Sequence, residues 1–364
     1  MDDAIEIDGS EGEGGGQIIR SALTLSLVTG RPFAIRKIRA KRDKPGLKHQ
    51  HMTACKAASR VGCAEITGAE VGSRELTFRP SGIFPGDYHF DVQTAGGTTL
   101  VAQTILPALM IAGGPSTVTI DGGTHNTWAP PFDFLARVYL PQVCRLGPQV
   151  SATLVRYGFY PAGQGRIELN VQPANLRGFD VMERGKFLSR QVTAVVANLP
   201  LHIAEREVDT AVRRLGWSAT EGTALAVPSA GPGNIVMIEH SCENVSEIAT
   251  SIGRIGLPAE RVAADAVREM RNYLRHSAPV GEHLADQWML PLAIAVAKTE
   301  IAHRFRTSKL SQHSLTHLDI IKRFLPVQTD VEADADQSVV VRISPATTKA
   351  ENQASSNSSS GSVS

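Results

Sequence analysis

Gly16-Gln17-Ile18-Ile19-Arg20 is the first of three glycine-led, helix-like runs that share one arrangement of side chains. The other two are Gly97-Thr98-Thr99-Leu100-Val101-Ala102-Gln103 and Gly281-Glu282-His283-Leu284-Ala285-Asp286-Gln287. An offset of 83 residues aligns Arg20 with Gln103, and an offset of 184 aligns Gln103 with Gln287. Because repeated units tend to present the same helix ends around a shared axis, we expect these three side chains to face one common site.

A longer repeat surrounds each run. Leu-Pro lies inside the second and third runs, at Leu106-Pro107 and Leu290-Pro291, and this is rarely a coincidence because a proline inside a helix costs about 3 kcal/mol. Each unit closes on a strand-like segment that ends in proline and has alternating apolar residues, as in a sheet with one covered face. These segments are 76–80, 169–173 and 341–345. A period of roughly 80–85 residues is too long for a solenoid and predicts a small βαβαββ layer for each unit.

The third unit is interrupted by roughly 100 residues between Phe179 and Pro279. This stretch has strand-like segments at 191–197 and 234–239 and helix-like segments at 205–215 and 258–275, which predict an inserted α/β domain. The predicted fold is therefore mixed α/β (α+β). A large three-repeat domain comprises residues 1–180 and 278–345, a smaller inserted domain comprises 181–277, and the Ser/Asn-rich tail 346–364 is expected to be disordered.

The overall composition excludes several classes of protein. The chain has 364 residues and a net charge of +1, so no overall charge draws it to nucleic acid. No run reaches the ~18–20 apolar residues of a membrane span, and the acidic start is unlike a signal peptide. Four cysteines without paired spacing predict free thiols. We therefore expect a cytoplasmic protein with no membrane partner, and an exposed edge strand would be compatible with a homodimer.

Local charge is more informative than the total. Seven basic side chains lie within residues 36–48, opposed by Asp43 alone. One interpretation is a solvated basic loop. The other is a phosphate-binding segment close to the Arg20 helix, because arginine and lysine suit phosphoryl oxygens. Aromatic residues make up only 5% of the chain, so recognition of a phosphorylated end fits better than stacking of bases along a groove.

The glycine-rich stretch 9–17 precedes the first helix-like run and could direct backbone N–H groups at an anion. No Gly-Lys-Ser/Thr follows, so it is not a P-loop, and Gln17 occupies the last glycine position of a dinucleotide fingerprint. A simple tight turn remains an equal alternative. A carboxylate in a phosphate-binding loop usually needs a cation, so Glu13 is a candidate ligand for a divalent metal.

Among eleven histidines, His313 is distinguished by its context. It precedes an apolar run that ends at Pro326, and Ser314 or Thr316 is expected to cap that helix. An imidazole beside a helix N-terminus lies near a pole that favours phosphate, and it can act as a nucleophile without a strong base. Gln50-His51 precedes the corresponding helix of the first repeat, which makes His51 the weaker candidate. Metal-binding histidine or paired-cysteine motifs are lacking, which argues against a structural zinc.

From about Ile5 to Pro345, the chain resembles the RNA 3′-terminal phosphate cyclases. Several separate segments carry the resemblance, in the order found in that family: residues 12–23, 38–40, 44–47 with 50–51, 158–163, 231–234 and 281–287. The family's fold is a large domain of three repeats, each like the C-terminal domain of a translation initiation factor, with a small inserted domain. The resemblance implies an ATP-dependent enzyme that acts on RNA with a 3′-phosphate.

The resemblance also implies a ligase-type reaction in three steps. His313 corresponds to the histidine that attacks the α-phosphate of ATP and holds AMP covalently. AMP then passes to the RNA 3′-phosphate, and the adjacent 2′-hydroxyl closes a 2′,3′-cyclic phosphate and releases AMP. The residues implied to bind ATP or AMP are Glu13, Arg20, Arg39, Gln103, Pro130, Phe134, His283, Leu284, Ala285, Asp286 and Gln287. Arg39, Arg42, Gln50 and His51 are implied to contact the RNA phosphate, and Glu13 to help place Mg²⁺ or Mn²⁺.

Three positions depart from the family pattern: His317 replaces an asparagine, His283 a tyrosine and Gln164 a glycine. None of these changes removes His313, so we expect activity. Two other classes stay open. A non-catalytic, cyclase-like RNA-binding ribosome-assembly factor would lack the nucleophilic histidine, and an enolpyruvyl transferase would use a related repeat architecture without a covalent histidine.

Overall fold

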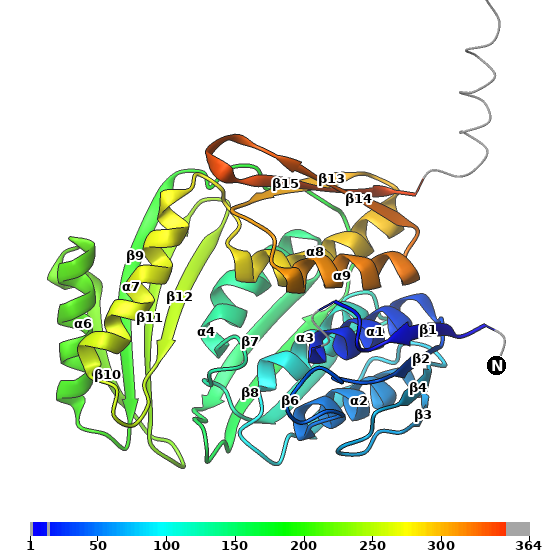
Figure 1. Ribbon diagram of the computed structural model, residues 1–364, viewed down its shortest axis with the longest axis horizontal. Coiled ribbons are helices and arrows are strands. Elements are labelled where there is room, and N and C mark those ends of the chain that lie inside the picture. The colour runs from blue at the N-terminus through cyan, green and yellow to red at the C-terminus, as the bar shows by residue number, and fades with distance from the viewer. Residues whose placement is uncertain (1–2, 13–14, 347–364) are drawn as a thin grey trace, which may run out of the picture.

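The computed structural model describes residues 3–12 and 15–346 and arranges them as three small layers with a separate lobe (Figure 1). The first repeat contains β1 (Ile5–Asp8), α1 (Gly16–Thr29), β2 (Phe33–Arg36), α2 (His49–Gly62), β3 (Glu65–Thr67) and β4 (Leu76–Arg79). Its sheet has the order β1-β2-β4-β3, in which β1 and β2 run parallel and the other pairs antiparallel.

The second repeat has the same topology. It contains β5 (Asp87–Asp91), α3 (Thr98–Leu109), β6 (Ser116–Gly122), α4 (Phe132–Phe134), the π-helical turn η1 (Leu135–Tyr139), α5 (Leu140–Arg145), β7 (Gln149–Arg156) and β8 (Gly165–Gln172). The sheet order is β5-β6-β8-β7, with β5 and β6 parallel. The predicted βαβαββ unit is confirmed in both repeats, and the predicted closing strand is the inner strand β4 or β8 of each sheet.

The third repeat contains α8 (Glu282–Thr299), β13 (His303–Thr307), α9 (Gln312–Phe324), β14 (Val327–Ala333), the short turn η3 (Ala335–Gln337) and β15 (Val339–Pro345), with the sheet order β13-β15-β14. The place of the first strand is taken by Val181 and Val280, which form parallel bridges to Phe305 and Thr307 of β13. The chain therefore leaves and re-enters the repeat at neighbouring points of one strand.

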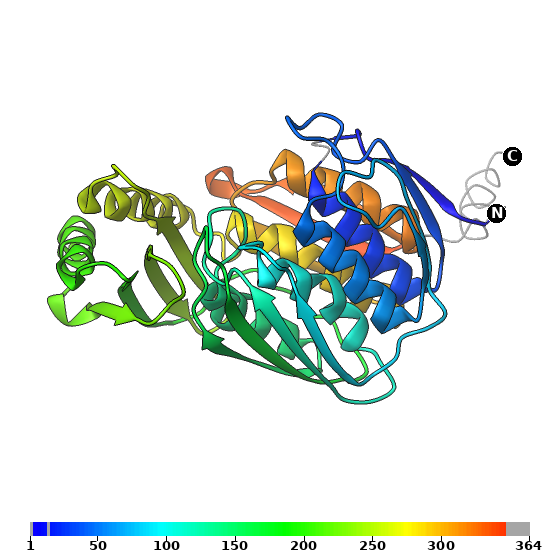
Figure 2. The same ribbon diagram turned by 90° about the horizontal axis from the view of Figure 1, so that it is seen from below.

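The lobe between these two points comprises β9 (Phe187–Ala197), α6 (Leu201–Leu215), the turn η2 (Ala219–Glu221), β10 (Gly222–Val227), β11 (Gly233–Cys242), β12 (Ser246–Ile252) and α7 (Ala259–Arg275). Its sheet has the order β10-β9-β11-β12, and α6 and α7 cover the face that is turned away from the repeats (Figures 1 and 2). The predicted strands and helices of the lobe are all present, and the structure adds two strands, β10 and β12, that the sequence pattern does not predict. Both are edge strands with few buried residues or with polar ends, so apolar alternation does not mark them.

The described residues form two hydrophobic cores, and the larger one also includes one face of the lobe's sheet, through Val195, Ile235 and Ile248. The larger core joins the sheets of the three repeats to α1, α2, α3, α8 and α9, whereas the smaller one lies between α6, α7 and the lobe's sheet. Pro107 and Pro291 lie inside α3 and α8, as the Leu-Pro repeat predicts. The mixed α/β fold of three repeats and an insertion is thus confirmed. The exact domain limits at 180/181 and 277/278 stay a prediction.

Three smaller expectations have different outcomes. All four cysteines are free, as predicted. Within residues 3–12 and 15–346, no helix combines the length and apolarity needed to cross a lipid bilayer. The tail expected to be disordered falls, after Ala346, outside the residues that the structure describes.

Candidate functional site

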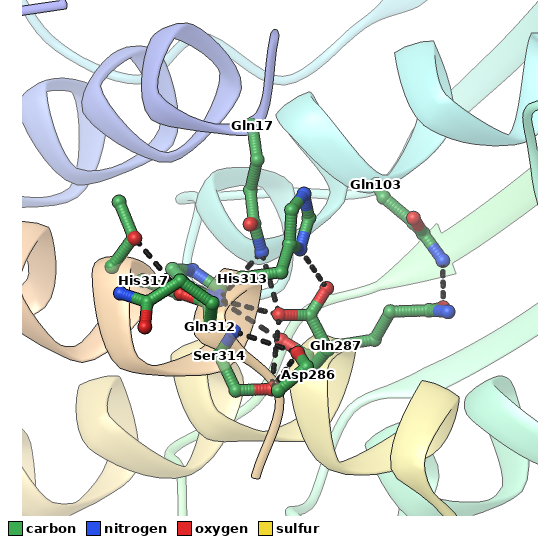
Figure 3. Close-up of polar contacts among 10 residues, drawn as sticks. Gln17, Gln103, Asp286, Gln287, Gln312, His313, Ser314 and His317 are labelled. Atoms are coloured by element: carbon green, nitrogen blue, oxygen red, sulfur yellow. Dashed lines mark hydrogen bonds and ion pairs between the residues drawn. The ribbon is translucent and has the colours of Figure 1, made fainter. Parts of the chain in front are cut away.

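A pocket of about 530 Å³ lies where α1, α3, α8 and α9 approach one another. Arg20, Gln103 and Gln287, the three side chains related by the repeat, all line it. Gln103 donates a hydrogen bond from Nε2 to Gln287 Oε1, so two of the three repeat-related residues contact each other directly (Figure 3). The pocket therefore coincides with the centre about which the three repeats are arranged.

Arg20 supplies a half-buried positive charge at the pocket. Burial lowers the pKa of its guanidinium to about 10, although the nearby Asp286 carboxylate opposes the change. Among residues 3–12 and 15–346, no side chain or carbonyl forms a hydrogen bond with this guanidinium. A half-buried guanidinium with unused donors suits an anionic ligand such as a phosphate.

His313 also lines the pocket, in the first turn of α9, and is about one-third exposed. Its Nδ1 donates a hydrogen bond of 3.0 Å to Asp286 Oδ2 on α8 (Figure 3). Because a carboxylate only accepts, Nδ1 carries the proton and Nε2 keeps a lone pair. The arrangement holds one ring nitrogen of His313 ready for nucleophilic attack.

Asp286 is the centre of a small polar network. Gln17 Nε2 donates to Asp286 Oδ1 at 2.9 Å, and Ser314 Oγ approaches the same oxygen at 3.5 Å. Burial by itself raises the pKa of Asp286, but the hydrogen bonds from His313 and Gln17, together with the electrostatic effect of the two neighbouring imidazoles, outweigh it and hold the pKa at about 2. Asp286 is therefore an anion at any physiological pH.

His317, one of the departures from the family pattern, lies behind this network. Its Nδ1 is 2.9 Å from the main-chain oxygen of Asp286 and 3.0 Å from Gln17 Nε2. Burial lowers the pKa of the ring, so His317 is neutral. Its Nε2 is buried and has no hydrogen-bond partner in the described part of the chain. The ring thus takes part in positioning Asp286 from behind without reaching His313 itself.

The start of α9 corrects one expectation. The helix begins at Gln312 and is capped by Ser311, whose hydroxyl accepts from the backbone N–H of Ser314 at 3.0 Å. Neither Ser314 nor Thr316 is the cap, because both are already helical and buried. His313 is therefore the second residue of the helix rather than a residue before it, close to the positive end of the helix dipole.

The nucleotide-binding candidates on α8 divide by helix face. His283, Asp286 and Gln287 line the pocket, at the three- and four-residue spacing of one face. Leu284 and Ala285 are 1% and 0% exposed, belong to the larger core and do not line the pocket. On the facing wall, Pro130 and Phe134 line the pocket together.

The basic segment lies outside the pocket. Arg39 is buried and uses Nη1 to donate to the carbonyl oxygens of Lys44 and Gly46, at 2.8 and 2.7 Å. It therefore holds the conformation of the segment itself. Arg42 is exposed, and its Nη2 would lie 3.3 Å from a Cβ placed on Gly15, next to the start of α1.

Gln50 and His51 occupy the first turn of α2 and do not line the pocket either. Gln50 Oε1 accepts a hydrogen bond from the backbone N–H of Gly97, at 3.4 Å. His51 is 3% exposed, and a Cβ on Gly16 would lie 2.1 Å from its Nε2. Only glycine at position 16 allows α1 to begin this close to the ring.

The predicted metal ligand, Glu13, falls outside the described residues. Within the described ranges, no group of three histidine, cysteine, aspartate or glutamate side chains could hold a metal ion. The metal site therefore stays a prediction.

Several pocket residues escaped sequence reasoning. Gln17 lines the pocket and contacts Asp286, whereas the sequence pattern marks it only as a position where a dinucleotide fingerprint would have glycine. Ile248 and Thr250 come from β12 of the inserted lobe, and no local pattern could have shown that this strand docks against the pocket. Trp128 lies at the pocket in the connection before α4 and is 87% exposed.

Comparisons with known proteins agree with this arrangement. The family model described as RNA 3′-terminal phosphate cyclase matches residues 11–331. A protein of that name from Koribacter versatilis is 48% identical over 332 residues, which cover 91% of this chain and 92% of the relative. A relative with the same name from Ectopseudomonas mendocina is 47% identical over 90% of this chain and 94% of the relative. Another, from Ralstonia nicotianae, is 45% identical over 92% of this chain and 96% of the relative.

Proposed function

The chain belongs to the RNA 3′-terminal phosphate cyclase family, and we propose on this premise that it converts an RNA 3′-terminal phosphate to a 2′,3′-cyclic phosphate at the expense of ATP. The reaction takes place in the pocket of the three-repeat body, residues 1–180 and 278–345, with residues 181–277 as a separate inserted domain. The single observation that carries this proposal is the His313–Asp286 pair, because it leaves His313 Nε2 free to act as a nucleophile.

In the first step, His313 Nε2 attacks the α-phosphorus of ATP. An N–P bond forms, the bond from the α-phosphorus to the bridging oxygen breaks, and pyrophosphate leaves. The ring becomes positively charged, and the Asp286 carboxylate stabilises that charge through Nδ1. Arg20 and Gln103 neutralise and position the phosphate oxygens, which is the main requirement of phosphoryl transfer.

In the second step, an oxygen of the RNA 3′-phosphate attacks the phosphorus of the bound AMP. A P–O–P linkage forms, the N–P bond breaks, and its electron pair returns to His313 Nε2. In the third step, the RNA 2′-hydroxyl attacks the activated 3′-phosphorus, loses its proton and expels AMP. The protein's contribution to both steps is positioning and charge stabilisation.

The pocket has room for one nucleotide, since ligand pockets of this kind span about 300–1,000 Å³. We assign the adenine to the wall that contains Pro130 and Phe134, with His283, Asp286 and Gln287 opposite. Leu284 and Ala285 support that wall from the core rather than by contact. The Glu269 carboxylate, 3.5 Å from His283 Nε2, raises the pKa of that ring to about 9.

We assign the RNA 3′-phosphate to the entrance beside the basic segment, where Arg42 and Gln50 are accessible from the first repeat. Arg39 and His51 act there indirectly, by supporting the segment and the first turn of α2. Glu13 remains the proposed ligand for Mg²⁺ or Mn²⁺, and no step above depends on that ion.

The test is incubation of the protein with ATP labelled at the α-phosphate, in the presence of Mn²⁺. Wild-type protein should acquire a label that is lost in acid and retained in alkali, as a phosphoramidate is, and His313→Ala should acquire none. Addition of RNA with a 3′-phosphate should release the label and make the RNA end resistant to phosphatase.

Other outcomes separate the alternatives. Tight RNA binding without any covalent label would favour a ribosome-assembly factor, whereas neither label nor RNA binding would leave the enolpyruvyl transferase. An acid-stable label would exclude attack by a histidine.

A further inference from the structure

Trp128 is a large exposed side chain of the pocket that the proposed chemistry leaves unused. Its exposed fraction is 87%. Of the exposed large apolar side chains in the described residues, it alone lines the pocket. A tryptophan exposed to this degree leaves a large apolar surface in water, and such exposure at a site often marks a binding surface.

The loop that presents Trp128 is held in place at several points. Trp128 donates from its backbone N–H to Asn126 Oδ1 at 3.3 Å, and buried Asn126 in turn donates to the carbonyl oxygen of Ala95 at 2.8 Å. On the other side, Thr99 Oγ1 donates to the carbonyl oxygen of Pro130 at 2.7 Å. The indole therefore lies on an anchored loop, so less conformational entropy of the loop is lost when a ligand binds.

The same loop is connected by contacts to the first turn of α2, which follows the basic segment. A Cβ on Gly97 would lie 2.4 Å from Cβ of Ala129, so the loop packs directly on the start of α3. Gly97 also donates its backbone N–H to Gln50, in the first turn of α2. A chain of neighbouring groups therefore leads to the pocket. It begins at the basic segment 36–48 and continues through Gln50 and Gly97 to the loop that carries Trp128.

We propose that Trp128 is the platform on which the base of the RNA's 3′-terminal nucleotide stacks. This inference rests on the proposed function. A pocket of about 530 Å³ has the size of a site for one small ligand, so with ATP inside we place the terminal nucleotide of the RNA at the rim while its 3′-phosphate reaches inward. Every base has a π-face, so this contact tolerates any terminal base.

The decisive experiment separates the ATP step from the RNA step in Trp128→Ala. Self-adenylation should stay within about twofold of wild type. The RNA concentration that half-saturates AMP transfer from preformed enzyme-adenylate should rise about 5- to 150-fold, the range that loss of one stacked base produces. Trp128→Phe should restore most of the loss, and Ile255→Ala, which removes an exposed apolar residue outside the pocket lining, should behave as wild type.

An RNA whose terminal nucleotide lacks its base completes a double-mutant cycle. Wild type should lose affinity for it by the same factor, and Trp128→Ala should lose nothing further. Equal half-saturation by wild type and Trp128→Ala would overturn the inference, and so would a comparable loss in self-adenylation, which would place the indole against adenine.

RNA binding without ATP, measured by the anisotropy of a labelled 3′-phosphorylated oligonucleotide, keeps the two proposals apart. Loss of binding in Trp128→Ala with an inactive wild type would refute the cyclase proposal but support the RNA contact. An active wild type with unchanged binding and transfer in Trp128→Ala would refute the contact alone.

Discussion

His51 and His313 lie in the first turns of α2 and α9, the second helices of the first and third repeats. His51 accepts a hydrogen bond at Nδ1 from the backbone N–H of Lys48, at 3.1 Å. His313 instead donates from Nδ1 to Asp286. The proton of the neutral ring is therefore on Nε2 in His51 and on Nδ1 in His313, so the two rings present opposite tautomers.

The surroundings strengthen this difference. Burial, followed by the charges of Arg20, Arg39 and Lys48, lowers the pKa of His51 to about 3. His313 faces a carboxylate and is partly open to the pocket. A repeat therefore supplies the same type of residue at comparable places, and the neighbour that binds Nδ1 decides which copy can be a nucleophile.

The largest expected effect follows directly from the tautomers. His313→Ala should abolish covalent labelling from α-labelled ATP, because no lone pair remains to attack. His51→Asn should still acquire the label, because in the wild-type protein His51 Nε2 carries a proton and faces Gly16, so this ring is not the nucleophile. Labelling is measured on denaturing gels, with circular dichroism to confirm that both variants fold. A labelled His313→Ala, or an unlabelled but folded His51→Asn, would reverse the assignment.

The next effect concerns the residue that sets the tautomer. Asp286→Asn should slow self-adenylation by on the order of 10³-fold, because an amide at this position no longer enforces the proton on Nδ1 or stabilises the charged ring. Single-turnover labelling measures the rate. Asp319→Asn, an exposed carboxylate on α9 that pairs with Lys322, is the matched control and should label at the wild-type rate. A slowing of less than tenfold in Asp286→Asn would contradict this role.

A third effect tests the other histidine through stability. Since the folded state lowers the pKa of His51, its neutral form is favoured, and this contribution is full above about pH 6.5 and is lost as the pH falls toward about 3. The loss amounts to at most about 4–5 kcal/mol. His51→Gln should therefore show a shallower decline in denaturant midpoint between pH 6.5 and 4. The exposed His49→Gln controls for removal of one histidine, and equal slopes in both variants would disprove the buried titration.

The smallest expected effect concerns the side chains that pack against the glycines at the starts of α1 and α8. A Cβ on Gly16 would meet His51, whereas a Cβ on Gly281 would lie 2.1 Å from Glu247 Oε2 of the inserted lobe. Burial raises the pKa of Glu247 to about 7, so its stabilising contribution is present below about pH 4.5 and is lost as the pH rises through 7.

Glu247→Gln should therefore leave the denaturant midpoint unchanged at pH 5 and raise it at pH 8.5, by at most about 3 kcal/mol in the free energy of unfolding. The exposed Glu205→Gln, in the same lobe, should change neither value. A Glu247→Gln variant that is less stable at pH 8.5 would show that the carboxylate is needed in its charged form.

Much of this arrangement is visible in the sequence because it repeats. The three glycine-led helices and the two Leu-Pro pairs predict the layers, and alignment alone places Arg20, Gln103 and Gln287 in one pocket. The sequence distinguishes less well between the residues of one helix that face the pocket and those that face the core. The resemblance assigns Leu284 and Ala285 to the nucleotide site together with Asp286 and Gln287, although the helical period of 3.6 residues turns both side chains into the core.

Other features depend on contacts that no local pattern encodes. In Ser311-Gln312-His313-Ser314 every residue is polar, and three of the nearby hydroxyls could cap a helix, so only packing selects Ser311. The partnership of His313 with Asp286 joins residues 27 positions apart, and the contribution of β12 to the pocket depends on how the lobe docks. These are tertiary interactions, and a single sequence does not reveal them.

The two bridges at Val181 and Val280 have a consequence for how such a molecule can be assembled. Because they meet β13 at Phe305 and Thr307, a short peptide could join the two ends and restore an uninterrupted third unit. The lobe is thus an insertion whose two ends meet at one strand, β13. Replacing it with another inserted domain would change the part of the pocket wall formed by Ile248 and Thr250, while the helix that carries His313 would stay in place.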